Sequence, residues 1–161
     1  MFKRLALFAF SIAFTMTSAL AAPPSGGMPP LPPQPKVRPA GMPTGYVMVS
    51  PCIQGMGEHW ANLKDMSAPI YGTHNGKPIF SEIMVPLKTL NAGFNYPNLA
   101  TLPGYKIDHV SIEYHPKGHE GMMIPHYDIH AYYITYAQQK AICPNGIPDP
   151  DAAAAMKMDK M

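Results

Sequence analysis

The stretch PIYGTHNGKPIFSEIMVP, residues 69–86, decides the fold. Its centre, Asn75-Gly76, is typical of the two-residue turn of a β-hairpin, and runs of β-forming residues flank it on both sides. We therefore expect strands over residues 69–74 and 77–85. Pro86 is expected to end the second strand, because proline has no backbone N–H to give to a sheet.

A second hairpin is predicted in YKIDHVSIEYHPKGHEGMMIPHYDIHAYYITY, residues 105–136. Its polar middle, residues 116–121, contains one proline and two glycines and is typical of a loop. Strands are expected on either side of this loop, over residues 107–115 and 124–136. The β-branched and aromatic residues of AYYITY favour a strand over a helix there.

The remaining segments add little regular structure. Residues 47–50 predict a short strand and residues 87–90 a single helical turn, and no long helix is indicated. The sequence therefore predicts a mainly β fold, a small antiparallel barrel or sandwich built from hairpins.

The chain begins with the features of an export signal. MFKRLALFAFSIAFTMTSALAAPP has two basic residues, an apolar run and Ala19-Leu20-Ala21 at the position of a cleavage site. We predict a signal peptide over residues 1–21, with an uncleaved membrane anchor as the alternative. The mature protein is expected to be periplasmic or extracellular, with no stable membrane insertion after cleavage.

The mature chain is long enough for one domain. Residues 22–45 are rich in proline and predict a disordered, flexible leader, either a spacer or a docking segment for a protein partner. The β-rich domain is expected over residues 46–143, followed by a flexible, methionine-rich tail over residues 144–161.

Charge and cysteine content narrow the function classes. The formal net charge of +2 is spread over the chain without a basic block, which argues against nucleic acid and an anionic membrane surface as binding partners.

Cys52 and Cys143 are an even pair in a chain with an export signal and predict a disulfide. The alternative, thiols that bind metal, is less favoured because the pair lacks a CxxC spacing.

The second hairpin gathers imidazoles and carboxylates. Side chains alternate along a strand, so His126, Asp128 and His130 share one face, while His109 and Glu113 share one face of the neighbouring strand. Such ligands suit zinc, copper or iron. We interpret this face as a candidate metal site.

The predicted register defines the neighbours on that face. A loop at residues 116–121 pairs His115 with Met122 and brings His109 close to Asp128. A shift of two residues would change these partners and keep the faces.

Distance limits how these ligands combine. Cα atoms four residues apart on a straight strand are about 13 Å apart, at ~3.3 Å per residue. A histidine holds an ion about 6–7 Å from its own Cα, with metal bonds near 2.1 Å. His126 and His130 therefore share an ion only if Pro125 bends the strand; otherwise each pairs with ligands from other strands.

Two residues outside this hairpin are further candidate ligands. His59 lies in the glycine-flanked stretch GMGEHW, residues 55–60, which we expect to be a loop. Glu82 interrupts an apolar run, and a carboxylate there is paired, bound to metal or turned to solvent. His74 is interpreted as an exposed turn residue. His119 is interpreted as an exposed loop residue, with a lid over the site as the alternative.

Four motifs together resemble a family of small exported bacterial proteins known mainly as a domain of unknown function. They are GMGEHW, IYGTHNGKPIFSE, IDHVSIEYHPKGHEG and PHYDIH, in this order, between about Cys52 and Tyr136. The resemblance implies a compact β-rich domain with a histidine-rich site, and it implies no particular activity. At the matching positions it points to His59, Glu82, His109, His126, Asp128 and His130.

The leading hypothesis is an exported metal-binding protein that handles copper or zinc through this His/carboxylate cluster. The chain contains 13 methionines, and Met122-Met123 directly precede the cluster. Thioethers are ligands for Cu(I), although methionine also fills gaps in protein cores.

Two alternatives use the same residues. A metal-dependent hydrolase or lyase needs an open water position on the ion and a base such as Glu113 or Glu82, and neither HExxH nor GxSxG is present in the sequence. A structural or interaction module would instead keep the cluster as a hydrogen-bonded network, with the leader as a tether.

Overall fold

The structure is a computed structural model, and it describes residues 30–149. The predicted signal peptide (residues 1–21), residues 22–29 of the leader and residues 150–161 of the tail lie outside the described residues. Within the described range, no helix has the length and apolar character needed to cross a membrane.

The described residues form one antiparallel six-stranded sheet with the strand order β1-β2-β3-β4-β6-β5. The mainly β fold is therefore confirmed, but the sheet is not closed into a barrel, because β1 and β5 are its two edges. The strands are β1 (Val47–Met48), β2 (Glu58–Ala61), β3 (Ile70–His74), β4 (Lys77–Pro86), β5 (His109–His115) and β6 (His126–Tyr132), and the helices are α1 (Leu87–Asn91) and α2 (Tyr136–Lys140).

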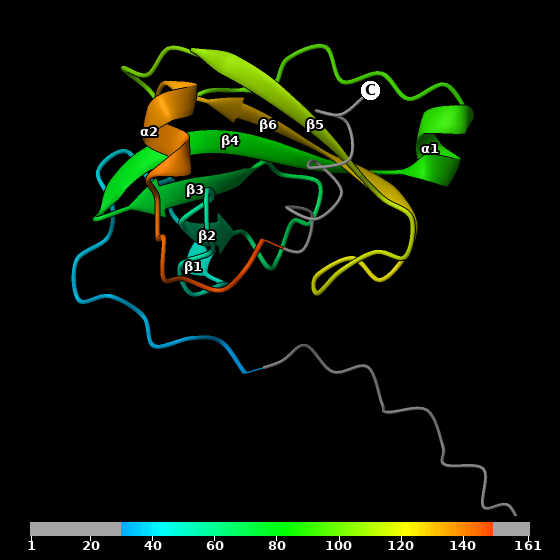
Figure 1. Cartoon of the computed structure of the whole chain (residues 1–161). Coiled ribbons are helices and arrows are strands. Elements are labelled where there is room, and N and C mark those ends of the chain that lie inside the picture. The colour runs from blue at the N-terminus through cyan, green and yellow to red at the C-terminus, as the bar shows by residue number, and fades with distance from the viewer. Residues whose placement is uncertain (1–29, 150–161) are drawn as a thin grey trace, which may run out of the picture.

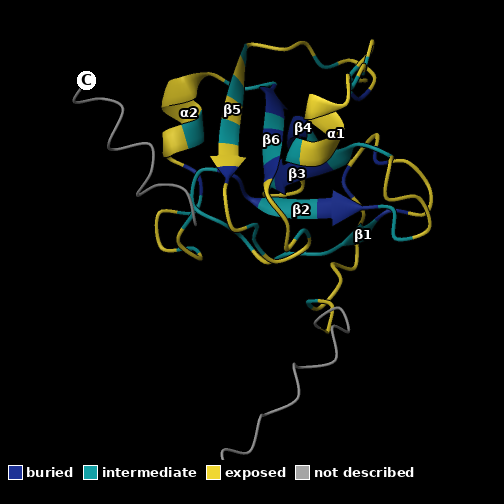
Figure 2. Cartoon of the chain, turned by 90° about the vertical axis from the view of Figure 1, so that its right-hand side faces the viewer, coloured by how far each residue is buried: buried dark blue, intermediate teal, exposed yellow. Residues whose placement is uncertain are grey.

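The sheet is strongly twisted. β1 and β2 lie below β4 and β6 in Figure 1, and β2 runs across the direction of β5 and β6 in Figure 2. Figure 2 also shows that buried residues concentrate on the inner strands, while α2 is largely exposed. The twist makes one face of the sheet concave, and this face carries the ionisable residues described below.

The first hairpin forms as predicted. β3 and β4 pair across Asn75-Gly76, where both residues have positive φ, 52° and 72°. This is the backbone of the hairpin turn that the Asn-Gly sequence favours. The predicted helical turn after Pro86 is also present, as α1.

The second hairpin forms in a different register from the predicted one. His115 lies opposite His126 instead of Met122, and His119 pairs with Met122 through two backbone hydrogen bonds of 3.0 and 3.1 Å. The chain therefore turns at residues 119–122, later than the predicted loop. The displacement is an even number of residues, so each side chain keeps its predicted face and changes its partner.

Two local predictions were wrong. His59 lies in strand β2, where it is opposite Gly72 of β3, and not in a loop. The strand predicted to continue to residue 136 ends at Tyr132, because Thr135 starts helix α2 with a capping box to Gln138.

The described part of the leader, residues 30–45, contains no helix or strand but contacts the domain. Gln34 exchanges two side-chain hydrogen bonds of 2.8 Å with the backbone of Met48 on the edge strand β1. Met42 is buried in an apolar cluster with Tyr46, Trp60, Tyr71 and Leu102. These contacts depart from the fully flexible leader that the sequence predicted.

A disulfide joins Cys52 to Cys143, as expected, with Cα atoms 6.1 Å apart. It ties the loop before β2 to the segment after α2. Beside it lies a second apolar cluster, formed by Met56, Ile79, Phe80, Tyr132 and Ile142.

Candidate metal centre

The concave face of the sheet is lined by ionisable side chains in adjacent strands. The register places Glu82 of β4 opposite His130 of β6, and His115 of β5 opposite His126. These four residues are at most 4 % exposed. Burying so many ionisable groups is costly unless they are paired or share a cation.

One group on this face consists of His115, His119, His126 and Asp128, here called the four-residue group. All three imidazoles direct Nε2 at the carboxylate: the Oδ2 atom of Asp128 is 3.0 Å from His115 and 2.8 Å from His119, and its Oδ1 atom is 3.1 Å from His126. Four potential ligand atoms therefore converge on one point.

The tautomers of two imidazoles in this group are fixed by backbone carbonyls. Nδ1 of His126 is 2.6 Å from the carbonyl oxygen of Ile124, and Nδ1 of His119 is 2.7 Å from that of Glu120. A carbonyl only accepts, so each Nδ1 carries its proton and each Nε2 of a neutral ring presents a lone pair. These two Nε2 atoms are 3.0 Å apart, which requires a proton or another cation between them.

Without metal, His119 supplies that proton. Its hydrogen bond to Asp128 raises the pKa of His119 to about 9. Burial alone would raise the pKa of Asp128, but His119 and the other imidazoles lower it below its ordinary value. Burial lowers the pKa of His115.

A second group consists of His59, Glu82 and His130, here called the three-residue group. The Oε2 atom of Glu82 is 3.9 Å from Nε2 of His59 and 3.6 Å from Nε2 of His130. On the other side of each ring, Nδ1 of His59 is 2.9 Å from the Ser50 hydroxyl, and Nδ1 of His130 is 3.0 Å from a carboxylate oxygen of Glu113.

Burial shapes the protonation of the three-residue group. It lowers the pKa of His59 to about 3, with a further contribution from His130, and raises the pKa of Glu82 to about 7. Burial also opposes protonation of His130, but Glu82 and Glu113 outweigh it and raise the pKa of His130 to about 9. In the metal-free protein, His130 is therefore the proton carrier of this group.

Every member of the two groups except His126 lines a single cavity of about 400 Å³. Its ionisable lining residues come from β2, β4, β5 and β6, except for His119 and Glu120 of the turn after β5, and the rest of its lining is largely apolar. The apolar wall includes Leu31, Met56, Met66, Ile70, Met84 and Ile147.

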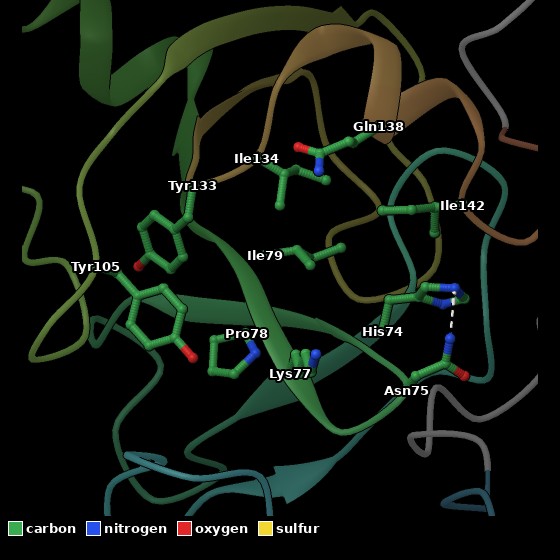
Figure 3. A pocket seen from close by; sticks show the side chains of 10 residues that line it. All are labelled: His74, Asn75, Lys77, Pro78, Ile79, Tyr105, Tyr133, Ile134, Gln138 and Ile142. Atoms are coloured by element: carbon green, nitrogen blue, oxygen red, sulfur yellow. Dashed lines mark hydrogen bonds between the residues drawn. The ribbon is translucent and has the colours of Figure 1, made fainter.

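A second cavity, of about 370 Å³, lies beside the hairpin turn and is shown in Figure 3. It is lined by side chains such as Ile79, Tyr105 and Tyr133, and none of its ten labelled residues is a carboxylate. His74 lies at this cavity, hydrogen-bonded to Asn75 (Figure 3), with Nδ1 3.5 Å from the sulfur of Cys143. The sulfurs of Cys52 and Cys143 are joined to each other in the disulfide.

The structure brings together five of the six predicted ligands, but in two groups. His126 and Asp128 belong to the four-residue group, and His59, Glu82 and His130 belong to the three-residue group. His126 and His130 therefore use ligands from other strands instead of sharing an ion, which is one of the two arrangements expected from strand geometry.

His109 lies outside both groups. Its ring stacks on Tyr132, with centroids 4.9 Å apart, and its Nε2 is 2.9 Å from the side-chain oxygen of Gln139 in α2. The register explains the difference, because His109 is opposite Tyr132 and not near Asp128.

His115 and His119 were not among the predicted ligands. His115 has the strand parity of the ionisable face, and that signal was present in the sequence. His119 is placed only by the turn at residues 119–122, which folds its ring back over Asp128.

Fold and site together define a small β-sheet domain whose concave face holds two groups of potential metal ligands. Residues 73–114 match the TTHB210-like family, described as hypothetical protein TTHB210. The chain is also similar to the crystal structure of hypothetical protein TTHB210 from Thermus thermophilus, with 26% sequence identity over 55% of this chain and 86% of that chain, and a TM-score of 0.47. The comparison with curated proteins found no match.

Proposed function

We propose that the protein is an exported metal-binding protein whose principal centre is the four-residue group. One observation carries the proposal: the Nε2 atoms of His119 and His126, each with Nδ1 held by a carbonyl, face one another at 3.0 Å beside Asp128. A single divalent cation would satisfy both lone pairs and the carboxylate, and His115 supplies a fourth ligand.

The ligand set favours zinc or copper. Three imidazoles and one carboxylate are borderline donors that suit Zn²⁺ and Cu²⁺, and four protein ligands complete the tetrahedral shell that zinc prefers. A filled shell leaves no position for a substrate. This supports binding or handling of the metal at this group over catalysis there.

Export is supported by two independent features. The N-terminal sequence has the charge and hydrophobic pattern of a signal peptide. The Cys52–Cys143 disulfide fits a protein that folds in an oxidising compartment.

The competing function is a structural module in which the same residues form a protonated hydrogen-bond network. The two functions differ in metal uptake, so elemental analysis and zinc or copper titration of the purified, untagged protein separate them. We expect at least one tightly bound equivalent, and the loss of one equivalent in His126→Ala and in Asp128→Asn. His109→Ala is the matched control, because His109 was a predicted ligand and lies outside both groups.

Absence of stoichiometric metal, with no uptake on titration, would contradict the proposal and favour the network. Unchanged uptake in both His126→Ala and Asp128→Asn would place the metal elsewhere. Circular dichroism of each variant checks that a lost equivalent does not reflect unfolding.

A further inference from the structure

The three-residue group has the spacing of metal ligands and not of hydrogen-bond partners. Its N–O distances, 3.6 and 3.9 Å, exceed the range of an N–H···O bond. Two ligand atoms that each lie about 2.05 Å from one ion are about 3.3 Å apart at the tetrahedral angle and about 3.6 Å apart at 120°. The two N–O distances are close to these values, and all three ligand atoms lie within 4.8 Å of one another, so small inward movements of the side chains would let them bind one ion.

Each imidazole in this group has a polar group within 3.0 Å of its outer nitrogen. Glu113 contacts Nδ1 of His130 and the Ser50 hydroxyl contacts Nδ1 of His59, which leaves both Nε2 atoms on the side of Glu82. A carboxylate or hydroxyl on the far nitrogen is the usual partner of a metal-binding histidine, because it fixes the ring orientation and tautomer.

The atoms that face the centre of the group are buried without a hydrogen bond. Among the described residues, Oε2 of Glu82 and Nε2 of His130 have no hydrogen-bond partner, and these side chains are only 3 % and 2 % exposed. Buried polar atoms of this kind are rare and costly in folded proteins. A cation at this position would satisfy both atoms at once.

The spacing between the two imidazoles is set by a packed ring. Phe80 contacts His59 and His130 edge-on, with centroid distances of 5.3 and 4.8 Å. Phe80 fits there because Gly72 lies opposite it, and a Cβ at Gly72 would come within 2.1 Å of the ring. The packed Phe80 ring therefore fixes the positions of the two histidine rings relative to each other.

We propose that His59, Glu82 and His130 hold a second metal ion with an open coordination position, and that this position takes a small carboxylate with an apolar tail. Three protein ligands leave a vacancy on a four-coordinate ion, whereas the four-residue group leaves none. A divalent ion with one carboxylate ligand keeps a net positive charge, which favours an anionic donor. The same cavity offers the tail an apolar wall that includes Met56, Met66 and Ile70.

This inference rests on the proposed function, because one protein is expected to bind metal at both groups. It deepens that function by assigning the reactive, ligand-binding role to the three-residue group. The test must therefore count the two ions separately.

The experiment uses Co²⁺ as a spectroscopic probe in the purified, untagged protein. We expect two equivalents in the unaltered protein, and one in Glu82→Gln, in His59→Ala and in Asp128→Asn. Octanoate should change the visible Co²⁺ spectrum of the unaltered protein and of Asp128→Asn, at a concentration at least tenfold below that needed for acetate. Glu82→Gln and His59→Ala should show no such change. Asp108→Asn, at an exposed carboxylate, is the matched control for the amide substitutions.

The outcomes separate the two ideas. A single equivalent that is lost in Asp128→Asn and kept in Glu82→Gln would overturn the second site and leave the proposed function standing. A single equivalent that is lost in Glu82→Gln and kept in Asp128→Asn would support the second site and overturn the proposed principal centre. Two equivalents with no response to octanoate would overturn the ligand class, and no bound Co²⁺ would overturn both proposals.

Discussion

Backbone carbonyls decide the chemistry of individual histidines in this protein. The carbonyls of Ile124 and Glu120 bind the outer nitrogens of His126 and His119, so the inner nitrogens of both rings face Asp128 with no freedom to exchange roles. A sequence cannot show such contacts, because they depend on where a turn places a carbonyl. It can show which residues share a face of a strand, and strand parity is how His126, Asp128 and His130 were predicted as candidate ligands. His59 and Glu82 were predicted from their local sequence instead.

The first prediction concerns proton release at the four-residue group. The pKa of His119 is about 9, so at pH 7 the metal-free ring carries a proton on Nε2 that a metal ion must displace. The variant Glu82→Gln leaves only the four-residue group intact. In this variant, zinc binding at pH 7 should release about one proton. The affinity for zinc should rise about tenfold per pH unit up to pH 9.

Calorimetric titration in two buffers of different ionisation enthalpy measures this release. A heat of binding that is independent of the buffer would contradict a proton held on His119. Adding His109→Ala to Glu82→Gln should leave the number of released protons unchanged, because His109 lies outside both groups.

At the scale of elements, the two hairpins differ in how much the sequence shows. The Asn75-Gly76 turn fixes the register of β3 and β4 locally, and both strands lie where the sequence places them. The turn between β5 and β6 has two glycines and no equally specific pair, and the observed register differs by four residues from the predicted one. That difference moved His109 away from the site and brought His115 and His119 into it.

Helix α2 was not predicted, because residue composition was given more weight than a local start signal. Aromatic and β-branched residues favoured a strand through Tyr136, whereas the capping box of Thr135 and Gln138 starts a helix. The Thr-x-x-Gln spacing is a helix start signal that the sequence did contain. Its consequence is specific, because α2 presents Gln139 to His109, which the register has already placed outside both groups.

The second prediction concerns the Gly72–Phe80 contact between β3 and β4. In Gly72→Ala the new Cβ would lie 2.1 Å from the Phe80 ring, so the ring must move. We expect the free energy of unfolding to fall by about 1–3 kcal/mol, as for other overpacked cores. Urea denaturation measures the loss.

The same substitution should weaken metal binding at the three-residue group more than at the four-residue group. The Phe80 ring packs against His59 and His130, and no ring contact joins it to a histidine of the four-residue group among the described residues. Equal weakening at both groups would show that Phe80 acts through general stability. Gly76→Ala is the control for a general loss of stability, because its positive φ strains an alanine while the new Cβ meets no atom within 4 Å.

At the scale of the whole molecule, a small, open sheet is tied by one covalent link and carries two groups of candidate metal ligands. The disulfide spans 91 residues, which include every strand except β1. The sequence predicted this link from the cysteine count and the export signal. It could not predict the open architecture, because whether a six-stranded sheet closes depends on twist and edge pairing, which no short motif encodes.

The third prediction is the contribution of the disulfide. Closing a loop of 91 residues stabilises the fold by about 4–5 kcal/mol in the chain-entropy model. The double variant Cys52→Ser/Cys143→Ser should lose stability of this order in chemical denaturation. Reduction of the unaltered protein should produce the same loss, and a strong mismatch between the two would indicate a substitution effect.

The fourth prediction is the pH dependence of stability. The folded-state pKa values of His119 and His130 are raised to about 9, whereas an unfolded histidine titrates near 6.5. Their stabilisation is therefore fully present below pH 6.5 and is lost as pH rises through 9. The metal-free protein should melt at progressively lower temperature between pH 6.5 and 9.5.

Metal-loaded protein should lack this decline over the same range, because the ion replaces the protons. Thermal unfolding followed with and without zinc makes the comparison. A metal-free melting temperature that is constant above pH 6.5 would contradict the protonation assigned to the two histidines.

The nearness of His74 to the disulfide sulfurs has a practical consequence for preparing the protein. Expression in a reducing cytosol would yield two free thiols beside an imidazole, a combination that scavenges zinc from buffers. Such a batch would give a spurious stoichiometry unrelated to the concave face. Material for metal counting should therefore be oxidised, or its thiols alkylated, before the first chelator is added.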